Sequence, residues 1–400
     1  MSLPSDRPHG LTIPLARWAE RQLCAMTRDH GLPFLDAAML MGERAAAGGY
    51  KVGARISAGL GASHLMPTRD GGWFALTLIR EVDRELLPAL FGDATIDTGD
   101  WNAIAAAVLQ HDCAHLVATG RLLGLPVAGM DETPASPPVE VLLAADHRRR
   151  MPGHRPLVVD LSAIWAGPLA GHLLWQAGME VVKVESRSRP DLIRRDDPAT
   201  FARINQGKAS LLVDLADAGQ KAALVALIRT ADVVVESARP RALRQIGIDA
   251  DSLVREVPGL VWLSITGHGA TGEAQHWVGI GNDCGVAGGL SRAMAEAGGG
   301  IGYVGDAIAD PLTGIVAARE GLAAWHSGFA QRIGLSMSAI AATALAEERA
   351  HDRAAIDADL RAWGRAAGQP FAAVPLRALQ APVSPIGADT ARYLLQASPC

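Results

Sequence analysis

The sequence contains few cysteines, and their spacing argues against two common structural devices. Cys24, Cys113, Cys284 and Cys400 are far apart, and no CxxC pair occurs. A disulfide framework or a zinc site would need paired or clustered cysteines, so we expect a reduced, cytoplasmic setting. The histidines also form no set with metal-ligand spacing. We therefore expect no metal site.

Long apolar runs and an excess of positive charge are missing as well. No apolar run reaches the roughly 20 residues of a transmembrane helix, so we expect no membrane partner. The first ten residues, MSLPSDRPHG, lack the basic-then-apolar pattern of a signal peptide, which again favours the cytoplasm. The net charge of −5 argues against a nucleic-acid partner, which would favour a basic face.

The composition is that of a globular protein, and the length suggests two domains. The chain has 400 residues, of which 49% are hydrophobic and 20% are charged. Residues 1–130 combine helical patterns with short β-like runs such as Trp73–Leu76, and predict a small α+β domain. Residues 131–155 include DETPASPP, a composition typical of a linker. Residues 156–400 form the predicted large domain.

The large domain alternates between apolar runs and helical patterns. The apolar runs lie at residues 157–161, 181–184, 210–213, 232–235 and 260–265. Helical patterns separate them, and Asp217 is the expected cap of a helix over 220–229. Long helices are expected at 315–327 and 336–365. This alternation predicts an α/β fold with an open, largely parallel, Rossmann-like sheet covered by helices on both faces.

The large domain opens with a strand-turn-helix-strand unit, Pro156–Ser186. Such units bind ligands beyond the carboxyl ends of their strands. A dinucleotide fold would place three glycines at the first turn, but this chain has only Gly167 and Gly171 there. Glu185 ends the second apolar run, as an acid would in that fold. A nicotinamide oxidoreductase is therefore disfavoured, although it remains an alternative.

Two basic residues and one glycine-rich loop follow apolar runs of the predicted sheet. Lys208 and Arg239 lie at strand edges, where cations suit phosphate or carboxylate groups. The loop Gly267–Gly272 follows the run at 260–265, and its glycines let the backbone approach a ligand closely. The alternatives are solvated loop charges and an ordinary turn.

Asp310 is the candidate nucleophile. It lies among small residues at the start of a predicted helix, with Pro311 at a position that suits a first turn. A carboxylate there acts either as a nucleophile beside a glycine-lined cavity or as a helix cap. Cys284 has no base near it in the sequence, so we interpret it as a small buried hydrophobe.

Taken in order, these segments resemble the family III CoA-transferases (the CaiB/BaiF family), which include α-methylacyl-CoA racemases. The resemblance runs from Val158 to about Ala339. It rests on VVDLSAIWAGPLAGHLLWQAGMEVVKVE, NQGKASLLVDL, ADVVVESARPRAL, LSITGHGATG (similar to the family's SGFGxTG loop), ADPLTGIVAA and SGFAQRIGLSMSAIA. The last segment, SPIGADTARYLL, resembles the family's C-terminal end.

The order of the domains differs from that of the family. Family members insert a small domain before the final segment, whereas here residues 40–130 resemble that small domain placed first. We infer a rearranged, permuted-like member, which is physically reasonable when chain ends lie close together. The resemblance implies a homodimer. Family dimers are interlocked, and the question of interlocking stays open for this order.

The resemblance implies an enzyme that moves CoA from an acyl-CoA to a carboxylic acid. Asp310 would form an acyl anhydride and then an aspartyl-CoA thioester. Coenzyme A enters as substrate, and no metal is implied. Arg187 or Arg189 would join Lys208 and Arg239 in holding the phosphates. The residues expected to contact CoA are Ile164, Trp165, Ala166, Arg187, Lys208, Ser237, Ala238, Arg239, Gly267, His268, Gly269 and Asp283.

Two alternatives within this fold stay open. The racemases carry a Gly-His-Asp stretch, and here it is Gly281-Asn282-Asp283. An amide does not exchange protons near neutral pH, which disfavours a racemase unless His268 or His276 substitutes. The other alternative is a CoA-binding protein without turnover.

Overall fold

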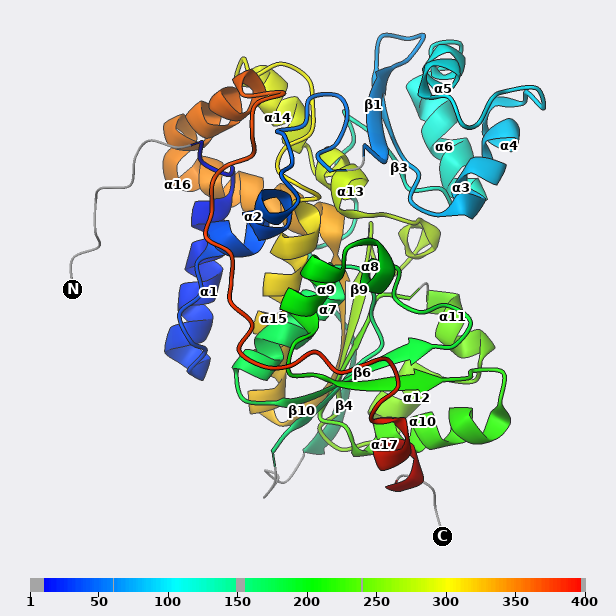
Figure 1. Cartoon of the computed structure of the whole chain (residues 1–400), viewed down its shortest axis with the longest axis vertical. Helices are drawn as coiled ribbons and strands as arrows, with labels where there is room; N and C mark the ends of the chain where they lie inside the picture. Colours follow the sequence, from blue (N-terminus) through cyan, green and yellow to red (C-terminus); the bar gives the residue numbers. More distant parts are fainter. Residues whose placement is uncertain (1–10, 60, 149–154, 239, 397–400) are drawn as a thin grey trace.

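A seven-stranded sheet forms the centre of the molecule (Figure 1). The computed structural model describes residues 11–59, 61–148, 155–238 and 240–396. Six parallel strands lie in the order β10-β9-β8-β5-β6-β7. They are β5 (Leu157–Asp160), β6 (Glu180–Ser186), β7 (Ala209–Val213), β8 (Val233–Glu236), β9 (Val261–Thr266) and β10 (Phe329–Ser336). The predicted α/β fold and the five predicted apolar strands are confirmed.

The strand order reverses between β5 and β8. The chain proceeds from β5 outward through β6 to β7, then returns to β8 on the other side of β5. In doubly wound sheets, the loops that follow the two strands at such a reversal diverge and leave a crevice at the carboxyl edge. The segments after β5 and β8 are therefore the first place to look for a ligand.

The seventh strand differs from the prediction for residues 131–155. Strand β4 (Val139–Arg148) pairs antiparallel with β10 at the edge of the sheet, where a linker was expected. The DETPASPP stretch ends just before β4, and the apolar content of VEVLLAADHR suits an edge strand with one covered face. The division into 1–130, 131–155 and 156–400 stays a prediction.

Helices cover both faces of the sheet because successive strand residues point to opposite sides. Val158 belongs to the core shared with one group of helices, and its neighbour Val159 belongs to the core on the other face. The first group contains α1 (Ala16–His30), α2 (Ala37–Ala47), α7 (Ala166–Gln176), α8 (Ile193–Asp196), α9 (Pro198–Asn205), α13 (Gly281–Ala287), α14 (Leu290–Glu296), α15 (Ala309–Ser327) and α16 (Met337–Arg365). The second contains α10 (Ala218–Thr230), α11 (Pro240–Gln245), α12 (Ala250–Glu256) and α17 (Thr390–Gln396). Asp217 caps α10 as predicted, accepting from the Gln220 N–H at 2.9 Å.

A smaller unit stands apart at the top right of Figure 1. Its antiparallel sheet contains β1 (Ser63–Pro67), β2 (Trp73–Thr77) and β3 (Val127–Gly129), covered on one face by α4 (Leu87–Phe91), α5 (Trp101–Val108) and α6 (Cys113–Leu123). Helix α3 (Glu81–Glu85) precedes α4. The other face of this sheet packs on α13 of the large unit through Val286 and Ala287. Helices α1 and α2 lie in the core of the large unit, so the N-terminal region contributes to both units.

The C-terminal segment runs along the large unit, and α17 lies beside β7. The Ser210 N–H donates to Asp389 at 2.9 Å, and the Leu212 N–H donates to the Thr390 hydroxyl at 3.0 Å. Upstream, the Gly207 N–H donates to the Pro382 carbonyl at 2.9 Å. The segment thus satisfies outward-facing donors of an edge strand. Among the described residues, none of the helices has the length and apolarity that a membrane crossing needs.

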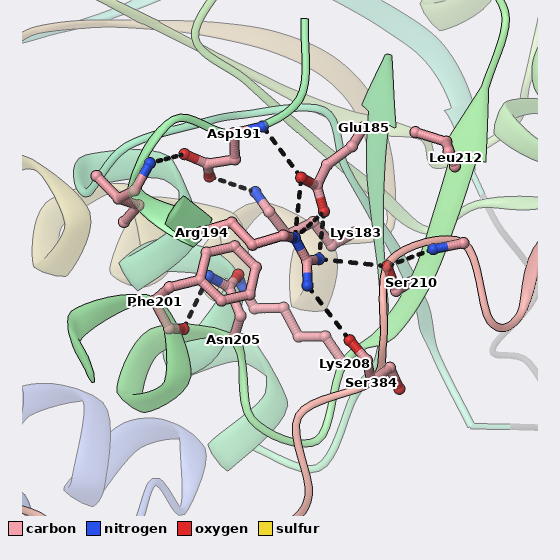
Figure 2. A network of polar contacts seen from close by, with 12 residues as sticks. Lys183, Glu185, Asp191, Arg194, Phe201, Asn205, Lys208, Ser210, Leu212 and Ser384 are labelled. Carbon is pink, nitrogen blue, oxygen red and sulfur yellow. Dashed lines mark hydrogen bonds and ion pairs between the residues drawn. The ribbon is translucent and has the colours of Figure 1, made fainter. Parts of the chain in front are cut away.

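Two buried lysines tie β5, β6 and β7 to the turn after β5 (Figure 2). The Lys208 ammonium contacts Asp160 at 2.8 Å, the Pro168 carbonyl at 2.7 Å and the Asn205 side-chain oxygen at 3.0 Å. The Lys183 ammonium contacts Asp191 at 2.9 Å. Burial lowers the pKa of Lys208 to about 8, which leaves it protonated at neutral pH.

Replacing Lys208 by methionine should destabilise the large unit by about 3–5 kcal/mol, because Asp160 would remain as a buried charge without its partner. Equilibrium unfolding in urea measures this loss. The matched control is Arg195→Ala, which breaks an exposed ion pair with Asp196 and should leave the midpoint unchanged. Equal midpoints for Lys208→Met and the native protein would contradict the assignment.

Candidate active site

Asp310 lies in the first turn of α15 with its carboxyl group almost fully buried, at 6% exposure. One oxygen accepts a hydrogen bond from the Gly281 N–H at 3.1 Å, and the Ala166 N–H also donates to the carboxyl group. Gly281 begins α13 and Ala166 begins α7. Two helix N-termini therefore present backbone donors to one carboxylate, an arrangement that suits negative charge.

Burial is the main cause of the raised pKa of Asp310, which lies at about 7. The charge of Arg44 and the two backbone hydrogen bonds oppose this shift. Arg44 comes from α2; its Nε donates to Asp306 at 2.8 Å and its guanidinium lies 4.8 Å from the centre of the Trp165 ring. At neutral pH, Asp310 is thus partly ionised in a poorly hydrated position.

A cavity of about 120 Å³ adjoins Asp310 at the point where the strand order reverses. It brings together predicted residues from three loops that are far apart in the sequence. Those lining it besides Asp310 are Ile164, Ala166, Ser237, Ala238 and Gly267. These loops follow β5, β8 and β9, so the residues meet at the carboxyl edge of the parallel sheet.

The turn after β5 has an unusual backbone conformation. Ile164 has φ of 72°, which is rare for a β-branched residue. Its N–H donates to both oxygens of Asp191, at 3.2 and 3.3 Å, and Asp191 is the partner of Lys183. Lys183 also donates to the Ser162 carbonyl at 2.9 Å. This buried ion pair holds the turn in the shape that aims the Ala166 N–H at Asp310.

Two glycines allow the cavity wall to form. A Cβ atom on Gly267 would lie 2.6 Å from the Gly279 backbone, and one on Gly281 would lie 2.1 Å from an Asp310 oxygen. Neither position has room for any other residue. The loop continues through Gly269, whose φ of 145° also favours glycine.

A second cavity of about 500 Å³ lies at the carboxyl ends of β5 to β8. It shares Ala163 and Ala238 with the cavity at Asp310, so the two spaces meet at the crevice. Its lining is largely apolar, with Arg189 among the lining residues. Arg187 is exposed immediately beside it.

A third and larger cavity, about 1150 Å³, lies between α6 of the small unit and the 3₁₀ helix η1 (Glu273–His276). Gln275 and Trp277 line both this cavity and the one at Asp310. Arg121 stacks on Trp277 at 3.9 Å from the ring centre. The small unit thus contributes to a space that adjoins Asp310.

The remaining predicted residues lie elsewhere. Lys208 is buried in the network of Figure 2 with three internal acceptors, so we assign it no phosphate contact. His268 and Asp283 are buried and are not among the residues that line the cavity at Asp310. Arg239 lies outside the described residues.

Sequence reasoning missed Arg44 and the role of Gly281. Arg44 carries no local signal, because only the packing of α2 beside α15 brings it near Asp310. Gly281 belongs to the Gly281-Asn282-Asp283 stretch, in which the sequence pattern points to the asparagine and not to the glycine. The absence of a tolerated Cβ at Gly281 becomes visible only in three dimensions.

Replacing Asp310 by asparagine should stabilise the protein increasingly as the pH rises from about 4 to about 7. In the native protein the folded state holds this proton up to about pH 7, whereas the unfolded state releases it near 4, so stability falls across that window. The variant lacks this loss. The free energy of unfolding of the variant, relative to that of the native protein, should rise by up to about 4 kcal/mol and then level off. Each tenfold change in proton affinity is worth about 1.4 kcal/mol.

Urea unfolding at a series of pH values measures this difference. Glu85→Gln, which changes an exposed acid of α3 in the small unit, is the control. A stability difference between the native protein and Asp310→Asn that does not vary with pH would contradict the raised pKa.

Comparison with known proteins bears on the same region. The family model described as CoA-transferase family III matches residues 156–385. The succinate–glutarate CoA-transferase of Agrobacterium fabrum is 31% identical over 220 residues, covering 50% of this chain and 55% of that protein. The acetyl-CoA:oxalate CoA-transferase of Acetobacter aceti is 31% identical over 127 residues, covering 30% of this chain and 33% of that protein.

Among solved structures, a hypothetical protein (Rv3272) of Mycobacterium tuberculosis is 29% identical, with a TM-score of 0.45 over 50% of this chain and 59% of that one. The chain spans about a third to a half of the length of these two curated relatives. The family match covers more than half of the chain, including the crevice, its loops and Asp310. This chain therefore belongs to CoA-transferase family III.

Proposed function

We propose that the protein transfers CoA from an acyl-CoA thioester to a carboxylic acid, with Asp310 as the covalent catalyst. The observation that carries this proposal is the buried carboxylate at the crevice, held by two backbone N–H groups. A carboxylate with few water contacts is a stronger nucleophile than a hydrated one. The CoA-transferase relatives support the same reaction class.

The proposed reaction exchanges acyl bonds and needs neither water nor a redox partner. An Asp310 oxygen attacks the thioester carbonyl, the C–S bond breaks, and CoA thiolate leaves a mixed anhydride. The thiolate then attacks the Asp310 carbonyl, which releases the donor acid and leaves an aspartyl-CoA thioester. The acceptor carboxylate attacks this thioester, and the expelled thiolate attacks the acceptor's carbonyl carbon, which frees Asp310.

The backbone donors position the nucleophile. The Gly281 and Ala166 N–H groups would hold one carboxyl oxygen so that the other faces the cavity. The N–H groups of the loop that begins at Gly267 are candidates for stabilising the oxyanion of each tetrahedral intermediate. These are proposals for the roles of Ala166, Gly267 and Asp310.

The two joined cavities suit the two ends of an acyl-CoA. The cavity of about 500 Å³ would take the nucleotide, with Arg187 or Arg189 toward its phosphates. The pantetheine arm would pass between Ala163 and Ala238 and place the thioester at Asp310. Ile164 and Ser237 would contact it along this route. Trp165 is buried and is not among the residues that line either cavity, and Arg239 remains a predicted phosphate contact.

The acids exchanged are proposed from the names of the relatives. The names of those relatives contain succinate, glutarate and oxalate, so short dicarboxylic acids are the first candidates. The lining of the cavity of about 1150 Å³ contains Arg121 and His276 but also four acidic residues, of which Glu132 pairs with Arg121 at 2.6 Å, so the relatives alone carry this proposal. We also propose a homodimer and a permuted-like domain order, both of which come from the family resemblance.

A racemase is the less favoured alternative. The Asn282 amide nitrogen donates to the Ser63 hydroxyl at 3.1 Å, and its oxygen accepts from the Ala307 N–H at 3.1 Å. Both ends of this side chain are therefore engaged in structure. His268 and His276 are not among the residues that line the cavity at Asp310. A binding protein without turnover is distinguished by the first experiment below.

Incubation with acyl-CoA donors should leave a covalent species on Asp310. Succinyl-CoA, oxalyl-CoA and glutaryl-CoA are mixed with the protein, which is then quenched with hydroxylamine and mapped by mass spectrometry. We expect a hydroxamate at Asp310 with at least one donor, and none in Asp310→Ala. Glu85→Gln, at an exposed position of the small unit, is the control that should still react. CoA binding without any adduct would favour the binding protein.

Replacing Ala238 by phenylalanine should narrow the junction of the two cavities and hinder acyl-CoA binding. We expect KM for acyl-CoA to rise by roughly tenfold or more, with a smaller change in kcat, because Asp310 and its donors are untouched. Steady-state kinetics measure the two constants. Ala354→Phe, at an exposed position of α16, is the control. Unchanged KM in Ala238→Phe would exclude this route for CoA.

A further inference from the structure

Three potential metal ligands that take no part in the proposed reaction converge beside the cavity wall. His268 follows β9, and Asp283 and Cys284 lie in the first turn of α13. One ligand atom from each lies within 4.8 Å of the other two. Their exposed fractions are 4%, 0% and 0%, so the three polar side chains are gathered in the interior and not on the surface.

The imidazole of His268 is oriented as a metal-binding histidine would be. The ring donates to the Val278 carbonyl, while Nε2 is buried and has no hydrogen-bond partner among the residues that the structure describes. Nδ1 is thus the donor, and Nε2 carries the free lone pair. Trp277 packs edge-on against the ring, with 5.9 Å between ring centres. A carbonyl acceptor on one ring nitrogen commonly fixes the tautomer of a histidine that binds metal through the other.

The sulfur of Cys284 faces the same point as this nitrogen. A Cβ atom added to Gly279 would lie 2.5 Å from the Cys284 sulfur and 3.1 Å from His268 Nε2. Both atoms therefore pack against the same side of Gly279, where a side chain is missing. The sulfur also lies 3.9 Å from Asp283 Oδ2.

Hydrogen bonds orient the Asp283 carboxylate and leave acceptor positions available on it. Its Oδ2 accepts from the Ile280 N–H at 3.1 Å, and its Oδ1 accepts from the Thr77 hydroxyl at 3.0 Å. Each carboxylate oxygen has two acceptor directions, so Oδ2 has one available. Second-layer hydrogen bonds of this kind orient carboxylate ligands in metal sites.

The charges around the group favour a cation. The positive charge of Arg121 acts on His268, and Glu132 pairs with Arg121 at 2.6 Å. Asp310 adds a second carboxyl group on the side of Asp283. The two carboxyl groups, Asp283 and Asp310, thus face a divalent ion without competition from Arg121, which is already paired with Glu132.

We propose that His268, Asp283 and Cys284 bind a zinc ion. Nitrogen, sulfur and carboxylate ligands with a tetrahedral preference are typical of Zn²⁺, and the softer sulfur disfavours Mg²⁺ and Ca²⁺. On binding, Cys284 would lose its thiol proton to solvent, and a Zn–S bond would replace the present S–H contact to the Gly267 carbonyl at 3.3 Å.

The ion would act as a clamp on the wall of the cavity. It would join the loop after β9 to the start of α13, and Gly281, the donor to Asp310, begins that helix. The three ligands lie behind Gly267 and Gly279, outside the lining of the cavity at Asp310. We therefore assign the zinc a positioning role. This inference does not depend on the proposed reaction.

Metal content of the full chain tests the proposal. After expression with zinc and dialysis against metal-free buffer, elemental analysis should find one zinc ion per chain. Cys284→Ala and His268→Phe should bind zinc at least tenfold more weakly. Cys113→Ala is the matched control, since Cys113 lies in α6 of the small unit and does not belong to the group of three ligands. Equal zinc content in Cys284→Ala and Cys113→Ala would overturn the assignment.

Cobalt substitution tests the site in the native protein, so the result there does not depend on whether a variant folds. Co²⁺ in the native protein should produce thiolate-to-metal charge-transfer absorption and the visible bands of a tetrahedral site. Both should persist in Cys113→Ala, and the charge-transfer band should vanish in Cys284→Ala. Zinc should also raise the Tm of the metal-free native protein. No stoichiometric zinc and no thiolate band in the native protein would refute the site.

Discussion

The turn that shapes the active site depends on buried lysine–aspartate pairs beneath it. Lys208 neutralises Asp160, which accepts from the Ser162 N–H at 3.0 Å, and Lys183 neutralises Asp191, which holds the Ile164 N–H. The turn fixed in this way ends at the Ala166 N–H that faces Asp310. Placing four charges in the interior is unfavourable unless each is paired and hydrogen-bonded. The conformational precision of this turn is a physical reason for retaining them.

Much of the fold could be predicted because its strands are short, apolar and regularly spaced. The run at 181–184 needs no distant partner to be recognised as a buried strand, and it is the centre of β6. Asp310 could be singled out because the family motif surrounds it. Strand β4 could not, since its pairing with β10 depends on residues nearly two hundred positions away. Burial reversed the expectation for Lys208, because strand-edge position alone does not tell whether an ammonium faces solvent or a buried carboxylate.

The same limit explains Arg44 and the ligand group at His268. Arg44 affects Asp310 only because α2 packs within the large unit. His268 and Cys284 are sixteen positions apart, and neither has a neighbour in the sequence at metal-ligand spacing. The glycines at 279 and 281 are informative in space, where the missing Cβ atoms leave room for a sulfur and for a carboxylate. Sequence patterns identify elements, whereas contacts between elements decide the chemistry of side chains.

The C-terminal segment has a consequence for self-association. The outer donors of β7 at Ser210 and Leu212 are occupied by Asp389 and Thr390 rather than by another strand. An outermost strand with free donors is a template on which a second chain can add, and continued addition leads to ordered aggregates. The last stretch of this chain thus closes the sheet without extending it. Removal of that stretch by a protease would convert a closed edge into a surface for strand exchange between molecules.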